Sequence, residues 1–231
     1  IVYYRNTRSF LVEGKASEII KLASLPSVSF IHPAGVAKLE HDESVPFIGQ
    51  DYVRSSWDGS GSHLGIIDSE VMLGTSGGVR HTDFNTVNSV AWDNTGDGAG
   101  TNPAPNAHGT HVAGTMIGDG TADSRYEGTA SGVGDSGTSR FFHGRFFDRN
   151  NNAVGDENNL YNALSSDFTD GAGTVAKRPD VINNSWGTTY TSGGVQITTS
   201  GTFQPAIDVD ARVWDGQTYV FAAGNDGAGG M

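Results

Sequence analysis

The chain contains no cysteine, few lysines and no long apolar run. The absence of cysteine from 231 residues excludes disulfide bonds and a cysteine nucleophile. Four lysines among 14 basic residues, against 26 acidic residues, leave a formal net charge of -12, which disfavours nucleic acid as a partner. No apolar stretch approaches the roughly 18 residues that span a bilayer, so no membrane segment is predicted.

Strand and helix patterns alternate along most of the chain. Apolar runs predict strands, and longer periodic segments predict helices; the strands cover residues 63–68, 141–147, 181–185 and 218–223, and the helices 108–118, 157–168 and 205–214. This alternation predicts an α/β fold in which a mostly parallel sheet is flanked by helices. A functional site is then expected at the carboxyl ends of the strands.

A histidine opens a segment of small and apolar residues that runs from His108 to Gly114. The pattern suits a helix that packs tightly on a sheet while its first residue faces a cleft. An imidazole has an ordinary pKa of about 6.5, so it can accept and return a proton at neutral pH. His111 is expected to turn into the packed face of the helix or into the loop before it. The two histidines have a spacing seen in zinc sites, but no comparable third ligand accompanies them.

Two apolar strands end in a polar side chain that suits chemistry with His108. Asp68 ends the run Leu-Gly-Ile-Ile-Asp, where its carboxylate can accept the Nδ1 proton of His108 and set the tautomer. Asn225 follows Tyr219-Val-Phe-Ala-Ala-Gly, where its amide can donate to an oxygen that gains negative charge. Taken alone, Asp68 would be expected to cap the turn that follows it, and Asn225 would be expected to be an ordinary turn residue.

In the order Asp68, His108 and Asn225, these segments resemble the motifs of the subtilisin-like serine proteases, the subtilases. The resemblance implies a serine endopeptidase in which His108 is the general base and acid, Asp68 orients it and Asn225 is the oxyanion donor. It implies protein or peptide substrates and a secreted or extracellular protein whose signal segment is not in this chain. The implied substrate-binding residues are Ser185, Trp186, Gly187, Ala222, Ala223 and Gly224.

The family's nucleophile motif, Gly-Thr-Ser before a small apolar helix start, does not follow Asn225 in this sequence. We therefore expect the serine to lie beyond Met231 and the given chain to be inactive by itself. Two Gly-Thr-Ser triplets end at Ser76 and Ser139, but they precede Asn225 and lead into no plausible helix. The first also matches the nucleophile elbow of α/β-hydrolases, without its strand and helix. The alternative function is a non-catalytic relative that binds peptides or a protein partner.

Glu70 departs from the family pattern, in which the aspartate is usually followed by Thr or Ser and then Gly. A second carboxylate near Asp68 is expected to raise one of the two pKa values. A glutamate at this place also resembles the related sedolisins, which use a glutamate in place of the histidine. The histidine motif at His108 disfavours membership of that family.

The first 45 residues differ in character from the rest. Strands over 1–4, 10–12 and 28–31 and a helix over 15–24 predict a small α+β segment. It resembles the second half of a subtilase prodomain, which implies that the protein's own prodomain is a partner, while residues 46–231 form an incomplete catalytic domain. The alternative is a simple N-terminal extension without a prodomain's function.

No cofactor is expected from the sequence. Residues 93–98 and 148–152 resemble calcium loops at their first positions, but both lack the twelfth-position glutamate of an EF-hand. Since many subtilases bind calcium in other loops, structural calcium is left open and no metal site is assigned.

Overall fold

The computed structural model divides the chain into two compact units, Ile1–Glu40 and His41–Met231. The assignment of the first unit to a prodomain stays a prediction. The structure describes residues 2–4, 9–12, 14–29, 31, 41–74, 79–96, 107–135, 139–155, 157–165, 168–169, 175–176, 178–187, 190–192, 195–197 and 204–222.

The first unit consists of a β-hairpin and one helix. Strand β1 (Val2–Tyr4) pairs antiparallel with β2 (Ser9–Leu11), and α1 (Ala16–Ala23) follows. The helix begins where the backbone N–H of Lys15 donates to the Glu18 carboxylate at 3.0 Å. The strand predicted over 28–31 is wrong: the described residues of this segment pair with no other strand, and without a partner its backbone cannot form a ladder.

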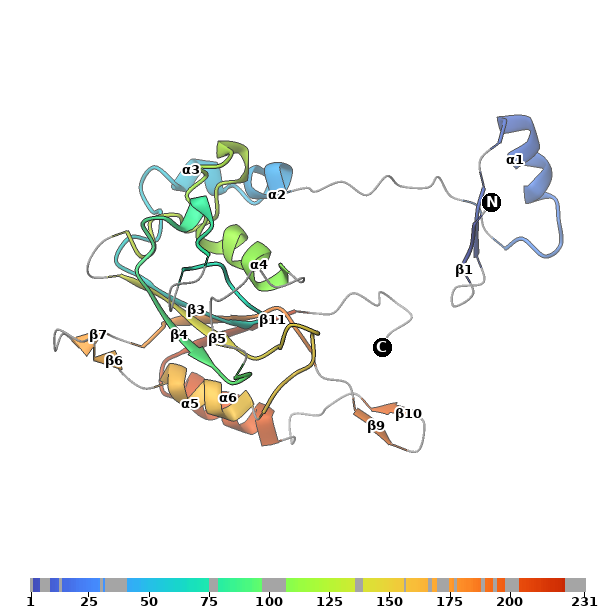
Figure 1. Cartoon of the computed structure of the whole chain (residues 1–231). Coiled ribbons are helices and arrows are strands. Elements are labelled where there is room, and N and C mark those ends of the chain that lie inside the picture. Colours follow the sequence, from blue (N-terminus) through green and yellow to red (C-terminus); the bar gives the residue numbers. More distant parts are fainter. Residues whose placement is uncertain are drawn as a thin grey trace. The chain divides into compact units, whose positions relative to one another are not determined.

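The second unit is built on a five-stranded parallel sheet in the order β11-β8-β3-β5-β4. The strands are β3 (His63–Asp68), β4 (Ser89–Asp93), β5 (Arg140–Arg145), β8 (Val181–Asn184) and β11 (Thr218–Phe221). Helices cover both faces of this sheet (Figure 1). The predicted α/β class is therefore confirmed, although β4 was not predicted from the sequence.

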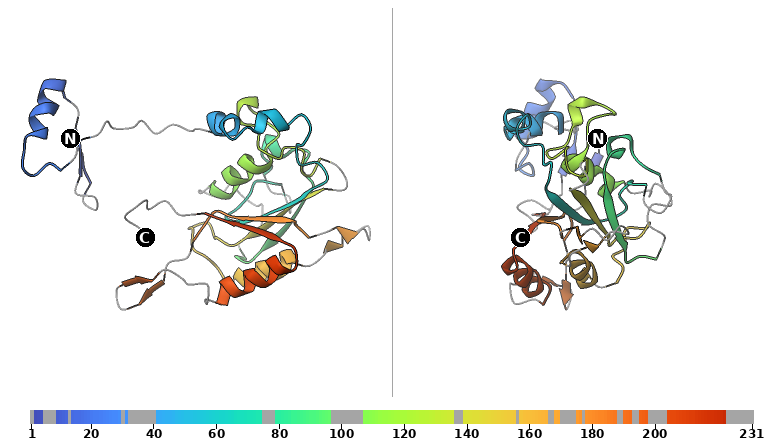
Figure 2. Two further views of the ribbon diagram at one scale, coloured as in Figure 1. Left: turned by 180° about the vertical axis from the view of Figure 1, so that it is seen from behind. Right: turned by 90° about the vertical axis from the view of Figure 1, so that its left-hand side faces the viewer.

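Successive residues of the central strands pack on opposite faces of the sheet. Ile66 joins one buried cluster with Ala113 and Ile117 of α4 (His108–Ile117). Ile67 joins a second cluster with Leu160 and Leu164 of α5 (Glu157–Ser165). Figure 2 shows α4 on one side of the sheet and α5 with α6 (Gln204–Trp214) on the other. Because both faces are covered, the central strands can be apolar along their length.

Helix α5 ends at Ser165, three residues before the predicted end. Phe168, expected on the buried stripe of this helix, instead belongs to the short strand β6 (Phe168–Thr169), which pairs with β7 (Val175–Ala176). The other short elements are the hairpin β9 (Tyr190–Ser192) and β10 (Val195–Ile197) and the 3-10 turns η2 (Thr82–Phe84) and η3 (Ser124–Tyr126).

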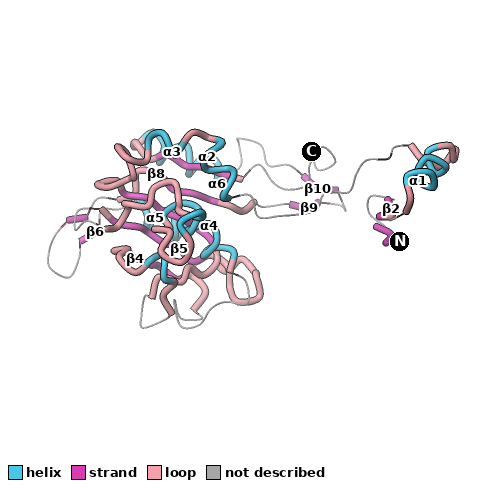
Figure 3. Tube along the Cα trace, turned by 90° about the horizontal axis from the view of Figure 1, so that it is seen from above, coloured by secondary structure: helices cyan, strands magenta, loops and turns pink. Residues whose placement is uncertain are grey.

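Two helices that the sequence analysis did not predict open the second unit. Helices α2 (His41–Phe47) and α3 (Gln50–Val53) lie next to each other (Figure 3). Just after α3, Arg54 pairs with Glu127 at 2.9 Å and so ties this segment to the loop that follows α4.

Candidate active site

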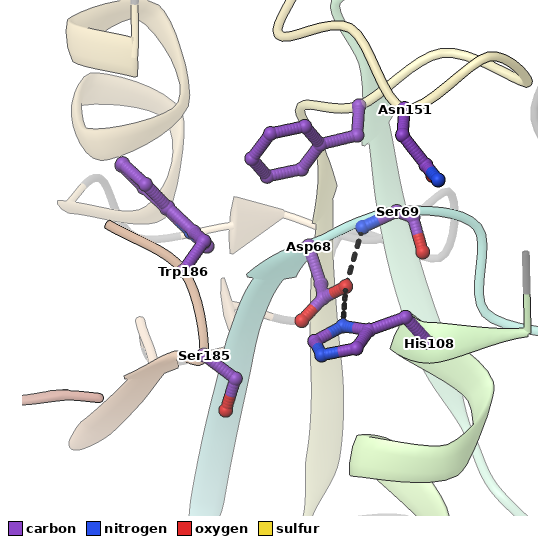
Figure 4. A pocket seen from close by; sticks show the side chains of 7 residues that line it. Asp68, Ser69, His108, Asn151, Ser185 and Trp186 are labelled. Atoms are coloured by element: carbon purple, nitrogen blue, oxygen red, sulfur yellow. Dashed lines mark hydrogen bonds and ion pairs between the residues drawn. The ribbon is translucent and has the colours of Figure 1, made fainter. Parts of the chain in front are cut away.

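Asp68 and His108 meet at the carboxyl edge of the sheet. Asp68 is the last residue of β3, and His108 is the first residue of α4. His108 Nδ1 lies 2.8 Å from Asp68 Oδ1 (Figure 4). An ionised carboxylate only accepts hydrogen bonds, so the imidazole donates its Nδ1–H, and in this tautomer Nε2 carries the lone pair that can accept a proton.

The two side chains differ sharply in exposure. The side chain of Asp68 is 2% exposed, whereas that of His108 is 48% exposed. Burial raises the pKa of Asp68 above its ordinary value, while hydrogen bonds from His108 and from the backbone N–H of Ser69, at 2.7 Å, act against this rise. The carboxylate is thus held in the protein interior while the imidazole is open to solvent.

The start of α4 packs closely on the turn that follows Asp68. The backbone N–H of Gly109, unpaired within a helix start, donates to Ser69 Oγ at 3.0 Å. A Cβ at position 109 would lie 2.5 Å from the Ser69 carbonyl oxygen, so only glycine permits this approach. Thr110 Oγ1 donates to the carbonyl of Glu70 at 3.2 Å. The turn therefore places the first residues of the helix.

A buried histidine on β5 contacts the same turn. His143 is fully buried, and its Nε2–H donates to the carbonyl oxygen of Ser69 at 3.0 Å. Burial lowers the pKa of His143 to about 4, so the ring is neutral at neutral pH. The sequence predicts that this residue lies in a strand, and it predicts no part in the site for it.

Glu70 does not act on Asp68 as expected. Its Oε2 lies 3.1 Å from Nη1 of Arg145, and both side chains are almost fully buried. Burial, rather than a neighbouring carboxylate, is what raises the pKa of Asp68. An arginine inside a buried strand needs an acidic partner. This requirement is the signal in the sequence from which an ion pair between Arg145 and Glu70 could have been predicted.

A pocket of about 200 Å³ opens beside His108. Its lining residues are Asp68, Ser69, His108, Phe147, Asn151, Ser185 and Trp186. One wall is aromatic, because the Trp186 ring packs against Phe147 with ring centroids 6.0 Å apart. The Trp186 Nε1–H donates to the carbonyl of Ile67 at 2.9 Å, which fixes this ring on the edge of β3.

The predicted substrate-binding residues fall in different places. Ser185 and Trp186 line the pocket, on the other side of Asp68 from His108 (Figure 4). Gly187 does not line it. Ala222 lies beside the end of β8, because its N–H donates to the carbonyl of Asn184 at 3.0 Å. Ala223, Gly224 and Asn225 lie outside the described residues, and the roles of all six binding residues and of Asn225 stay predictions.

His111 was expected on the packed face of α4 or in the loop before it, and this expectation is wrong. The helix packs through Gly109, Ala113 and Ile117, which are four residues apart, so His111 falls on the exposed side. Within the described part of the chain, no group of three or more His, Asp or Glu side chains is arranged to hold a metal ion.

The two internal Gly-Thr-Ser triplets differ in what the structure says of them. Ser139 is fully buried, and its Oγ accepts the backbone N–H of Gly134 at 2.8 Å, so no substrate can reach it. Ser76 lies outside the described residues.

The comparisons with known proteins agree with this architecture. The sequence model of the Subtilase family matches residues 59–231, which is most of the chain. The chain therefore belongs to the subtilase family. Curated proteins give no match. Among the described residues, no helix has both the length and the apolar character needed to cross a membrane.

The fold is similar to that of a solved subtilisin-like protease. The crystal structure of the psychrophilic subtilisin-like protease Apa1 from the Antarctic psychrotroph Pseudoalteromonas sp. AS-11 matches with a TM-score of 0.51 and 20% sequence identity. The match covers 78% of this chain but 36% of that chain, so this chain spans about a third of the length of that protein.

Proposed function

We propose that this chain carries the base and its orienting carboxylate in a serine endopeptidase. The observation that supports the proposal most directly is the 2.8 Å hydrogen bond that Nδ1 of a half-exposed His108, which lines a pocket, donates to Asp68. Together with membership of the subtilase family, this arrangement favours activation of a hydroxyl group by His108.

The proposed reaction assigns each proton to a named atom. As the serine Oγ forms a bond to the carbonyl carbon of the peptide, His108 Nε2 takes the hydroxyl proton. The same nitrogen then protonates the amine that leaves when the C–N bond breaks, and a water molecule later releases the acyl group by the reverse transfers. Asp68 keeps the ring in the Nδ1–H tautomer and stabilises the imidazolium. Asn225 would donate to the oxygen that becomes negative.

We place the serine in sequence that follows Met231. Two serines line the pocket, but both hydroxyls already accept hydrogen bonds within the fold. Ser69 Oγ accepts the N–H of Gly109, and Ser185 Oγ accepts the amide of Asn183 at 2.9 Å. These contacts give both side chains a structural role, and in the family's motif order the nucleophile follows Asn225, so we propose that another segment contributes it.

The proposed substrate is an extended segment of a protein or peptide. The chain after β8, from Ser185 to Gly187, leaves the sheet beside the pocket and can pair with such a segment by strand addition. The aromatic wall formed by Phe147 and Trp186 favours an apolar side chain there. Residues 1–45 are proposed to be the end of the protein's own prodomain, and a secreted location is proposed with it.

The test is serine-directed labelling of the full-length protein with a fluorophosphonate, followed by peptide mapping. We expect one labelled serine, located after Met231, and no labelling of the His108→Ala variant. The matched control is His111→Ala, which removes an exposed imidazole from the same helix and should label normally. Labelling of Ser69, Ser76, Ser139 or Ser185 would refute the assignment. Peptide binding without any labelling would point to the non-catalytic alternative.

A further inference from the structure

Glu70 and Arg145 form a buried ion pair beside the candidate site. The side chains are 3% and 1% exposed, and Glu70 Oε2 lies 3.1 Å from Arg145 Nη1. The carboxylate of Asp93, on the neighbouring strand β4, lies 3.9 Å from the same nitrogen. Desolvation of two charges is costly, so such a pair is a poor means of stabilising a fold in general. Its contribution is better sought in the segments that it connects.

The pair connects β5 to the turn that follows Asp68. In the sheet register, Arg145 is paired with Asp68 on one side and with Asp93 on the other, so the three residues form one row at the carboxyl edge. The side chain of Arg145 extends from this row to Glu70, two residues beyond Asp68. His143, two residues earlier on β5, holds the carbonyl of Ser69. Two side chains of β5 therefore hold consecutive residues of the turn.

The same turn also holds the start of α4. Ser69 Oγ accepts the N–H of Gly109, and the carbonyl of Glu70 accepts the hydroxyl of Thr110. A displacement of Glu70 therefore shifts groups that contact the two residues directly after His108. Hydrogen bonds weaken steeply once the angle at the hydrogen falls below about 120°, so a displacement that tilts the imidazole far enough would weaken its bond to Asp68.

We propose that Glu70 and Arg145 are positioning residues, whose ion pair holds the turn that aligns Asp68 with His108. Neither side chain lines the pocket, so both act through the turn and through the first residues of α4. This inference rests on the proposed function, because it concerns the residues that would act as base and orienter there.

The test measures which ring nitrogen of His108 carries the proton. In the full-length protein with ¹⁵N-labelled histidine, NMR in alkaline buffer distinguishes the Nδ1–H tautomer from the Nε2–H tautomer. The His108 signals are assigned by their absence from His108→Ala. The Asp68→Ala variant gives the tautomer ratio in the absence of the orienting carboxylate. The loss of a charged hydrogen bond of the usual strength should raise the ratio of Nε2–H to Nδ1–H by about 10- to 100-fold. This readout requires no peptidase activity.

Three variants separate alignment from folding: Glu70→Gln, Arg145→Met and the double variant. Glu70→Gln leaves Arg145 with the more distant carboxylate of Asp93 at 3.9 Å, and Arg145→Met leaves the buried Glu70 carboxylate without its arginine, so each single variant should lower the melting temperature. The double variant buries neither charge and should recover most of that loss. If the pair aligns the site, the tautomer ratio should move toward Nε2–H by at least about threefold in all three variants, including the double variant, because a misaligned charged bond is weaker.

Two results would overturn the proposal. One is a wild-type tautomer ratio in the double variant, which would mean that the ion pair does not affect the alignment of His108 with Asp68. The other is an equal change in Glu127→Gln, a control that breaks the 2.9 Å ion pair with Arg54 away from the pocket. If the single variants do not fold, the double variant still decides the question. A failure of the labelling test would refute the peptidase and leave this measurement of alignment intact.

Discussion

The carboxylate of Asp68 is buried, whereas the His108 ring that it binds at 2.8 Å is half exposed. The buried partner can hold a fixed orientation, because it belongs to a strand in the middle of the sheet. The exposed partner can exchange protons with whatever enters the pocket. This division of roles means that variants of the two residues should have different effects.

Removal of the imidazole at position 108 should abolish turnover. For His108→Ala, we expect kcat/KM on a peptide substrate to fall by a factor on the order of 10⁵–10⁶, because the nucleophile loses its base. His111→Ala should stay within about twofold of wild type, since that side chain is exposed on the same helix. Near-normal activity of the first variant, shown to be folded by circular dichroism, would contradict the assignment.

Asp68→Asn should separate activity from stability. An amide can donate to Nδ1 and so favours the wrong tautomer, and the expected loss in kcat is roughly 10⁴-fold. The raised pKa of Asp68 means that the folded state disfavours its charge. The neutral variant should therefore melt at an equal or higher temperature at pH 7. A large drop in both melting temperature and activity would indicate a structural role instead.

His143 should make the fold sensitive to acid. Its pKa is lowered to about 4 in the folded state, against 6.5 as the ordinary value. Between these two values the unfolded chain binds a proton that the folded chain does not. The free energy of unfolding should therefore be highest above pH 6.5 and fall by at most about 3 kcal/mol as the pH drops to 4.

The control for this prediction is His143→Gln, which does not titrate in that range. Urea unfolding at several pH values should show a shallower dependence for the variant between pH 6.5 and 4. Identical slopes for both proteins would contradict the assignment of this acid sensitivity to His143.

Two glycines of α4 should respond to alanine in opposite directions. Alanine is favoured over glycine in a helix interior by about 1 kcal/mol, and Gly114→Ala should gain about this amount because a Cβ there meets nothing within 4 Å. Gly109→Ala should instead lose stability and activity, since its Cβ would lie 2.5 Å from the Ser69 carbonyl oxygen. Thermal unfolding of both variants checks this, and stabilisation by both would mean that the turn yields easily.

The sequence by itself determined the elements that carry the candidate site. The apolar run that ends at Asp68 forms β3 as predicted, and the segment that opens at His108 forms α4. Both patterns are local, because burial on a strand or a helix repeats within a few residues. The strand predicted over 28–31 failed, since strand formation also depends on a distant partner.

Only the tertiary structure decided which side chains support the site. Glu70 reads in sequence as a second carboxylate near Asp68, but β5 brings Arg145 to it and their charges are buried together. His143 reads as one more residue of a strand, yet it holds the turn that contacts α4. Local periodicity shows which face of an element is buried. The partner on that face depends on the order in which β3, β5 and α4 pack, and no short segment of sequence contains that order.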